Sequence, residues 1–304
     1  MLLPLVLDVS SMLRERFPGF QGQPLEMPQP AREAFGVYRD RLKLQGIKLL
    51  VDVSPQGKTA FWGEPLLTPG PNGEANWRGQ PVCAPEQLRE AVAQLSSQGI
   101  QLFSHCNGDA AIDLMIEACR RAGLKSEQDH GTVIIHSQFM APGQLKQYVE
   151  LGLHPSFFTV HAFFFGDVHL SNLGPERAGR MSPMASAMAL GLHCSNHNDF
   201  SVRPIEPMRM VQNAMTRRTR SDGVLGPSEC VSADAALCAL TIEAAWQIRE
   251  EASKGSLAPG KRADLVILDA DPTATAPEQL NDIAVVATLK DGACVYGSLE
   301  GNTP

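Results

Sequence analysis

Short apolar runs recur along the chain, and each ends in polar residues before a helical pattern begins. In order they are LPLVLDVS (3–10), GIKLLVDVS (46–54), IQLFSHC (100–106), TVIIHS (132–137), LHPSFFTV (153–160) and LHCSNHND (192–199). A strand buried on both faces is continuously apolar, and strands that alternate with helices form parallel sheets. The pattern predicts an α/β fold, for which an incomplete TIM-type β/α barrel is the best match.

Helical patterns fill the intervals between these runs. PEQLREAVAQLSSQG (85–99) and AIDLMIEACRRAG (111–123) carry apolar residues at helical spacing, and both stop at glycine, as helices commonly do. Residues 55–83 are rich in Pro, Gly and Trp and are predicted to form a long loop. A loop of that length in a compact domain is usually functional or disordered.

The chain changes character after the helical stretch 232–248. GSLAPGKRADLVILDADP (255–272) and IAVVATLKDGACVYG (283–297) have the pattern of strands joined by turns. We therefore predict two units. Residues 1–254 form the β/α barrel portion, with about strands three to eight of a barrel, and residues 255–304 form a small β-sandwich-like segment.

The charge of the chain argues against a polyanionic partner. Its 304 residues carry a formal net charge of -7, so neither nucleic acid nor an anionic membrane is an expected partner. The basic cluster TRRTR (216–220) is best explained as a solvated helix end. No run approaches the roughly 20 apolar residues of a membrane span, and the N-terminus lacks a basic signal region. Seven scattered cysteines without a CxxC pair indicate free thiols and a cytoplasmic protein.

Four residues near the ends of the apolar runs are candidates for chemistry: Lys48, His105, His136 and Asp199. Barrel enzymes build their sites from the carboxyl ends of strands and the loops that follow. Two imidazoles and a carboxylate suit a divalent, zinc-like ion and leave room for a bound water. Taken singly, each has a plainer explanation: a histidine can be a hydrogen-bonded structural residue, Asp199 can cap a turn and Lys48 can be solvated. Their equivalent places in successive units favour the metal site.

Several motifs occur in an order that resembles the amidohydrolase superfamily, in particular its amidohydrolase-3, or YtcJ-like, branch. They are SHCNGDAAID (104–113), IIHSQF (134–139), LGPERAGRMSP (173–183), HNDFSVRP (197–204) and GSLAPGKRADLVILDADP (255–272). VSPQGKTAFW (53–62) resembles the loop after the fourth barrel strand of that branch. The resemblance runs from about residue 45 to the end. It implies a metal-dependent hydrolase that cleaves C–N bonds other than peptide bonds in small amide-like substrates.

The resemblance also implies roles for individual residues. His105 and His136 match the histidines that end strands five and six and bind metal. Asp199 matches the aspartate that ends strand eight and acts as both ligand and general base. Lys48 matches a strand-four lysine that bridges two metals when it is carboxylated. The implied cofactor is one or two divalent ions, with zinc as the first expectation.

Further histidines follow these positions. His161, at or just beyond the seventh strand, could hydrogen-bond the substrate or the developing oxyanion and so act as a second catalytic residue. Its alternative is a packing role, and His169 has a weaker claim to the site. His197, two residues before Asp199, is expected to support that aspartate without binding the metal.

The chain departs from the family pattern at its start. The H-x-H motif of the family's first strand is missing, and six barrel-like runs stand where eight strands are expected. The sequence therefore resembles the C-terminal portion of a longer amidohydrolase. Three explanations remain: a chain that begins late, a truncated and inactive protein, or a partner chain that supplies the rest. Open strand edges would favour aggregation or a homo-oligomer, unless the N-terminal segment replaces part of what is missing.

Two classes of function stay open on the sequence. One is a hydrolase that uses His105, His136 and Asp199, since three protein ligands suffice for a catalytic zinc. The other is a catalytically silent homologue kept as a structural or binding module. A phosphoesterase on a similar barrel is disfavoured, because neither a glycine-rich phosphate cradle nor an extra carboxylate cluster is evident in the sequence. Seven aromatic residues belong either to an apolar substrate pocket or to the core: Phe61, Trp62, Phe157, Phe158, Phe163, Phe164 and Phe165.

Overall fold

The computed structural model describes residues 33–299, and its centre is a parallel sheet. Five strands lie in the order β3-β4-β5-β6-β7, and every neighbouring pair is parallel. Their bounds are Gly46–Leu50 for β3, Gln101–Cys106 for β4, Val133–His136 for β5, His154–Phe157 for β6 and Ser195–Asn196 for β7. Five of the six predicted apolar runs are thus confirmed as parallel strands. The first predicted run, residues 3–10, lies outside the described residues.

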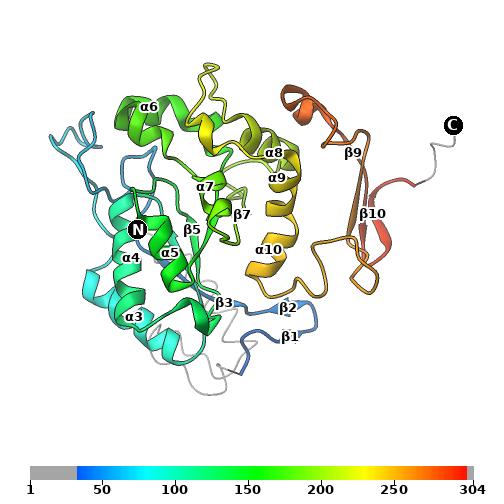
Figure 1. The fold of residues 1–304 in the computed structure, drawn as a ribbon, viewed down its shortest axis with the longest axis horizontal. Coiled ribbons are helices and arrows are strands. Elements are labelled where there is room, and N and C mark those ends of the chain that lie inside the picture. The colour runs from blue at the N-terminus through cyan, green and yellow to red at the C-terminus, as the bar shows by residue number, and fades with distance from the viewer. Residues whose placement is uncertain (1–32, 300–304) are drawn as a thin grey trace.

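Helices connect these strands and cover the sheet (Figure 1). Within residues 33–299 they are α3 (Pro85–Ser97), α4 (Asp109–Arg121), α5 (Gln144–Leu151), α6 (His161–Gly179), α7 (Met184–Ala189), α8 (Pro207–Thr216), α9 (Ala233–Leu240) and α10 (Ile242–Gln247). Three short 3-10 turns accompany them: Ser126–Gln128, Pro227–Glu229 and Pro277–Asp282. Alternation of this kind is typical of an α/β fold. Within the described residues, β3 and β7 are the edge strands of the sheet.

Helix α4 shows how the apolar pattern becomes packing. Its residues Ile112, Met115, Ile116 and Cys119 recur at helical spacing, and all four are buried in the main core. That core lies between the sheet and its helices and also holds Val51, Leu102, Ile134 and Phe157. The helix ends just before Gly123, whose φ of 76° is one that glycine adopts without strain.

The long segment predicted between residues 55 and 83 contains no helix or strand. It is nevertheless anchored, because Trp62 is only 2% exposed and the Leu67 amide donates to the Asn172 carbonyl on α6 at 2.8 Å. The Arg177 guanidinium also donates to the Pro65 carbonyl at 2.7 Å. The segment is therefore packed against α6 at the carboxyl-terminal side of the sheet, where the candidate site lies.

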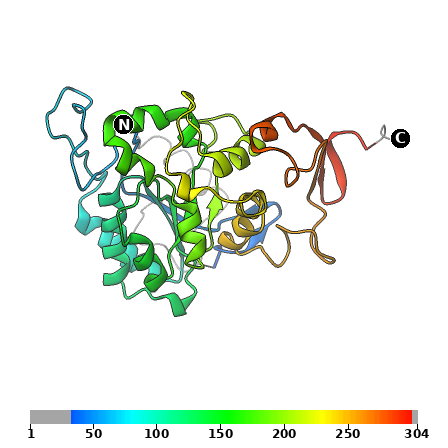
Figure 2. The same ribbon diagram turned by 45° about the horizontal axis from the view of Figure 1, so that its top comes forward.

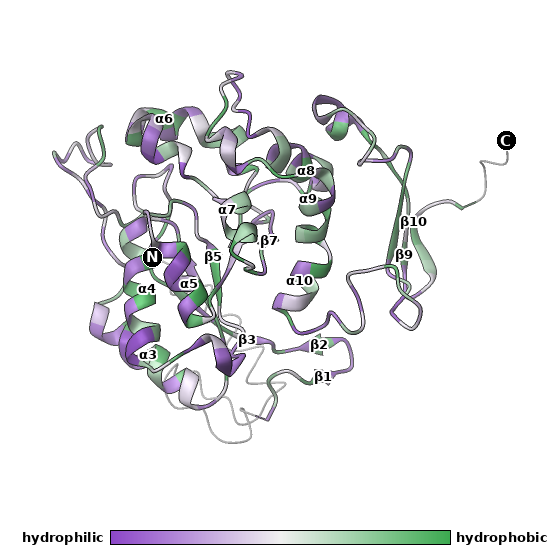
Figure 3. Ribbon diagram, in the orientation of Figure 1, coloured by the Kyte–Doolittle hydropathy of each residue, from purple (hydrophilic) through white to green (hydrophobic). Residues whose placement is uncertain are grey.

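A second, antiparallel sheet follows the helices. It has the order β10-β9-β8, with bounds Leu265–Leu268 for β8, Val285–Lys290 for β9 and Ala293–Gly297 for β10. Figures 1 and 2 place it at the opposite end of the molecule from α3 and α4. Figure 3 shows apolar residues along β10, and Val266, Val295 and Tyr296 are all more than half exposed. A hairpin, β1 (Tyr38–Arg39) with β2 (Leu42–Lys43), precedes the parallel sheet.

Two further expectations can be compared with residues 33–299. All seven cysteines are free, which agrees with the thiols predicted from their spacing. In this part of the chain, no helix combines the length and the apolar character that crossing a membrane requires.

Candidate metal centre

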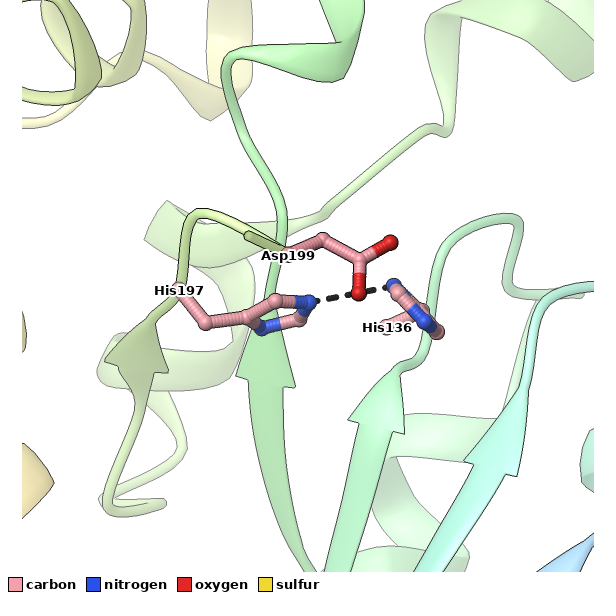
Figure 4. Close-up of side chains that lie close together, drawn as sticks. All are labelled: His136, His197 and Asp199. Carbon is pink, nitrogen blue, oxygen red and sulfur yellow. Dashed lines mark hydrogen bonds between the residues drawn. The ribbon is translucent and has the colours of Figure 1, made fainter. Parts of the chain in front are cut away.

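Three side chains converge at the carboxyl ends of β5 and β7. His136 is the last residue of β5, and His197 and Asp199 follow β7. One donor atom from each lies within 4.8 Å of the other two (Figure 4). His197 Nε2 is 3.1 Å from His136 Nδ1. Two imidazole nitrogens and a carboxylate oxygen around a common point are a donor set that fits a divalent ion such as zinc.

The backbone turns His136 toward this point. The register of β4 and β5 pairs His136 with Cys106, whose side chain is buried in the core between sheet and helices. Strand alternation alone would point both side chains into that core. His136 instead has a φ of 72°, and its ring lies 4.4 Å from the ring of His105. Asp199 has a φ of 54°. Positive φ values at non-glycine residues are costly and cluster at functional sites.

Burial keeps the two central histidines neutral. Burial is the main reason why the pKa of His136 lies well below 6.5, and the nearby His197 and His105 lower it further. Burial also lowers the pKa of His197 to about 3, with the charges of Lys48 and His105 adding to the effect. A neutral imidazole has the free lone pair that metal binding needs. The Nδ1 atom of His197 pairs with the Ser156 hydroxyl at 3.0 Å, which leaves Nε2 to face His136.

His105 lies beside the three converging side chains but outside their group. Its Nδ1 atom is 3.4 Å from Oδ1 of Asp52, and its Nε2 atom is 3.3 Å from the side-chain nitrogen Nδ2 of Asn107. The Asn107 nitrogen is a donor, so Nε2 is the unprotonated nitrogen of the ring and Nδ1 carries the proton. The Asp52 carboxylate lies beside Nδ1 without forming a hydrogen bond to it, and Nδ1 is buried without a hydrogen-bond partner among the described residues.

Asp52 holds the loop that carries His105. Its side chain is 0% exposed. It accepts hydrogen bonds from three backbone N–H groups: that of Asn107 at 2.8 Å, that of Gly108 at 2.8 Å and that of Phe61 at 3.0 Å. A Cβ on Gly108 would lie 1.9 Å from the Phe61 carbonyl oxygen, so this position needs glycine. Asp52 therefore ties β3, the β4–α4 turn and the 55–83 loop together behind His105.

Lys48 differs from its expected position at a strand end. It lies in the middle of β3, where it pairs with Phe103, and its side chain is exposed. Its positive charge is nevertheless close enough to lower the pKa of both His136 and His197. An unmodified Lys48 thus acts on the centre as a neighbouring cation.

His161 is the first residue of α6 and is 3% exposed. Its Nε2 atom is 3.2 Å from Oε1 of Gln56, and its Nδ1 atom is 3.1 Å from Nε2 of His169. The ring of Phe158 lies 5.1 Å from that of His161, 5.4 Å from that of His197 and 6.1 Å from that of His136. Phe158 therefore connects His161 to the converging group.

Of the seven aromatic residues predicted to line either a substrate pocket or the core, some are buried in the core and others are only partly buried. Trp62, Phe157 and Phe158 are buried and belong to apolar clusters of the core. Phe61 and the run 163–165 are only partly buried. Arg203 lies over the Phe164 ring, 3.1 Å from its centroid, so part of this aromatic surface is covered by arginine.

Two residues near the centre could be predicted from the sequence only in part or not at all. His197 was expected only to support Asp199, yet its Nε2 atom lies within the converging donor set. The two-residue spacing of His197 and Asp199 after an apolar run was the available signal. Asp52 has no comparable signal, because its partners come from positions 61, 107 and 108 and meet it only in the folded chain.

A parallel α/β sheet with histidines and an aspartate gathered at its carboxyl edge matches the place where β/α-barrel enzymes build their active sites. The chain belongs to the amidohydrolase family, whose model matches residues 17–296. This confirms the family expected from the motifs.

Relatives and solved structures agree with this membership. The N-substituted formamide deformylase of Arthrobacter pascens is 28% identical over 211 residues, which cover 69% of this chain and 39% of that protein. Protein LONG AFTER FAR-RED 3 of Arabidopsis thaliana is 30% identical over 266 residues, which cover 86% of this chain and 44% of that protein. A crystal structure of an uncharacterized metal-dependent hydrolase from Pyrococcus horikoshii matches with a TM-score of 0.69 at 22% identity, covering 89% of this chain and 50% of that one. The chain thus spans less than half the length of these two curated relatives.

Proposed function

We propose that this chain is a metal-dependent hydrolase that cleaves C–N bonds, other than peptide bonds, in small amide-like substrates. The observation that carries the proposal is the convergence of His136, His197 and Asp199 at the carboxyl edge of the parallel sheet. Membership of the amidohydrolase family supports the same reaction class.

The proposed ligands combine the sequence prediction with this geometry. His136 and Asp199 occur in both. His105 and His197 flank His136, with ring centroids 4.4 Å and 4.8 Å from it, and each offers a further nitrogen. Lys48 is proposed as a bridging ligand only in its carboxylated form, since a bare ammonium group repels a cation. Zinc is the proposed ion because imidazole and carboxylate donors suit it.

Separate residues of the chain carry out proton transfer and stabilisation of the oxyanion. When bound, a divalent ion supplies an activated water and polarises the substrate carbonyl. Asp199 takes the proton from the attacking water and hands it to the leaving nitrogen. His161 donates a hydrogen bond to the oxyanion that develops on the carbonyl. The rings of His136, Phe158 and His161 are buried, and limited access of water on that side strengthens the hydrogen bond from His161.

A hydrolysis assay tests the proposal. The named activity of the Arthrobacter relative makes N-substituted formamides the first substrates to try. With zinc-loaded protein, we expect amine release that falls by a factor of about 100 or more in Asp199→Asn, since general acid–base catalysis contributes this much. Asp269→Asn, an exposed carboxylate on the antiparallel sheet side, is the matched control and should keep full activity.

Equal rates in the wild type and in Asp199→Asn would contradict the assignment of Asp199. A folded, zinc-loaded protein without activity on any amide of a broad panel would favour the alternative class, a catalytically silent homologue that serves as a structural or binding module.

A further inference from the structure

His161 and His169 form a hydrogen-bonded pair inside the molecule. Both belong to α6, and their rings stack with centroids 4.9 Å apart and an interplanar angle of 15°. Nε2 of His169 is 3.1 Å from Nδ1 of His161. His169 is 0% exposed and packs edge to face against Phe139 at 4.9 Å. Among the described residues, the hydrogen bond to His161 links His169 to the candidate centre.

The protons in this chain of contacts can be assigned from the partners. Gln56 presents its Oε1 atom to Nε2 of His161, and an amide oxygen only accepts hydrogen bonds, so Nε2 of His161 carries the proton. A neutral imidazole has one proton, and its Nδ1 atom must then accept. The proton in the bond between the two rings accordingly belongs to Nε2 of His169. Nδ1 of His169 keeps a lone pair, and this atom is buried without a partner among the described residues.

The reverse order of protons is less favourable. It requires the amide nitrogen of Gln56 to face His161, and it places an N–H group at the buried, unpaired Nδ1 of His169. A buried N–H without an acceptor is rarer in proteins than an under-used acceptor. Both rings are neutral in either order, because burial lowers the pKa of His161 well below 6.5 and that of His169 to about 3.

We propose that His169 is a positioning residue that holds His161 in the tautomer with its proton on Nε2. In this state His161 faces the loop of Gln56 as a hydrogen-bond donor, and a substrate carbonyl that displaces Gln56 meets an N–H group and not a lone pair. The link to catalysis rests on the proposed role of His161, whereas the tautomer is a property of the chain and can be measured without metal or substrate.

Nuclear magnetic resonance of the side-chain nitrogens provides the test. The chain has eight histidines, so ¹⁵N labelling of histidine alone gives a small set of signals, and His161→Gln identifies those of His161 by their loss. In the metal-free protein at pH 7 we expect a proton attached to Nε2 of His169 that shows scalar coupling across the hydrogen bond to an unprotonated Nδ1 of His161. A proton found on Nδ1 of His161, or no coupling between the two rings, overturns the proposal.

Two variants separate positioning from packing. His169→Leu fills similar space without a donor, and we expect the Nδ1 signal of His161 to move to the position of a nitrogen without a hydrogen bond. His169→Gln retains an N–H at the end of its side chain and should restore the hydrogen-bonded position. An unchanged His161 signal in His169→Leu would contradict the assignment. If His169→Leu does not fold, the wild-type coupling and the Gln variant decide. A wild type that neither binds zinc nor hydrolyses amides would refute the proposed function, whereas the tautomer of His161 measured by magnetic resonance would still stand.

Discussion

The candidate centre depends on backbone conformations that its own side chains disfavour. His136 and Asp199 both have positive φ values, a region in which an L-residue costs about 1–2 kcal/mol. Hydrophobic periodicity predicted that His136 ends a strand, and the structure confirms it. Periodicity could not predict the direction of the ring, because strand alternation places residue 136 on the same face as the buried Cys106.

This strain predicts an unusual order of stability at position 136. In metal-free protein, His136→Gly should be more stable to urea than His136→Ala by roughly 1 kcal/mol, because only glycine adopts a φ of 72° freely. Position 197 is the matched control, since it belongs to the same group and is absent from the positive-φ residues. There, Ala should be at least as stable as Gly. If Ala is at least as stable as Gly at position 136 too, the backbone at His136 is not strained.

Buried histidines predict a loss of stability in acid. Burial, with a smaller contribution from His193, lowers the pKa of His154 to about 4, and burial lowers that of His169 to about 3. Both take up protons more readily in the unfolded chain, where the pKa is 6.5. Their contribution is therefore fully present above pH 6.5 and is lost as the pH falls toward 4, by about 1.4 kcal/mol for each pH unit and histidine.

Urea unfolding of the metal-free protein at pH 6.5, 5.5 and 4.5 measures this effect. Replacing His169 with Gln removes one titrating ring, so the slope of unfolding free energy against pH should become shallower by about one proton. Parallel slopes for the wild type and His169→Gln would mean that His169 titrates equally in both states.

At the scale of elements, the turn between β4 and α4 positions His105. The sequence predicted a strand at 100–106 and a helical pattern at 111–123, and the structure confirms both, with β4 ending at Cys106 and α4 beginning at Asp109. The close approach of this turn to Phe61 was not predictable, because residues 61 and 108 are distant in the sequence and meet through the buried Asp52. Local pattern identifies the elements, whereas long-range hydrogen bonds decide how the loops pack.

The turn has no room for a side chain at position 108. Gly108→Ala should lower the free energy of unfolding by about 1–3 kcal/mol or more, because its Cβ would overlap the Phe61 carbonyl oxygen. Gly179→Ala is the control, since its Cβ would meet only ordinary contacts at 3.7 Å and beyond. Thermal or urea denaturation of the two variants compares them directly. Equal stability would show that the 55–83 loop moves away without cost.

At the scale of the molecule, the sequence predicted the fold class and the family correctly. Buried parallel strands tend to be apolar, so the strands β3 to β7 could be recognised from the short apolar runs that alternate with helical patterns, although β7 itself is only Ser195–Asn196. The division at residue 254 stays a prediction. The C-terminal part of the described chain forms a single three-stranded sheet, in which Val266 is 55% exposed and Val295 is 62% exposed. Exposed apolar surface of this kind commonly marks an interaction site.

This exposure predicts self-association of the chain. In sedimentation velocity we expect a concentration-dependent increase in mass that the double variant Val266→Lys, Val295→Lys weakens, because a buried ammonium group opposes an apolar contact. Val82→Lys replaces an exposed valine outside both sheets and should leave the association unchanged. A wild type that stays monomeric at every concentration would exclude this surface as a contact between copies.

The central claim is that His136, His197 and Asp199 hold a divalent ion. The most direct measurement is metal content per chain by plasma mass spectrometry, on protein purified without chelator or histidine tag. We predict about one zinc ion per chain, lost in His136→Ala and Asp199→Ala and retained in His130→Ala, whose ring bonds Thr132 and the Leu151 carbonyl. A folded wild type without metal, or equal zinc in all three variants, would contradict the account.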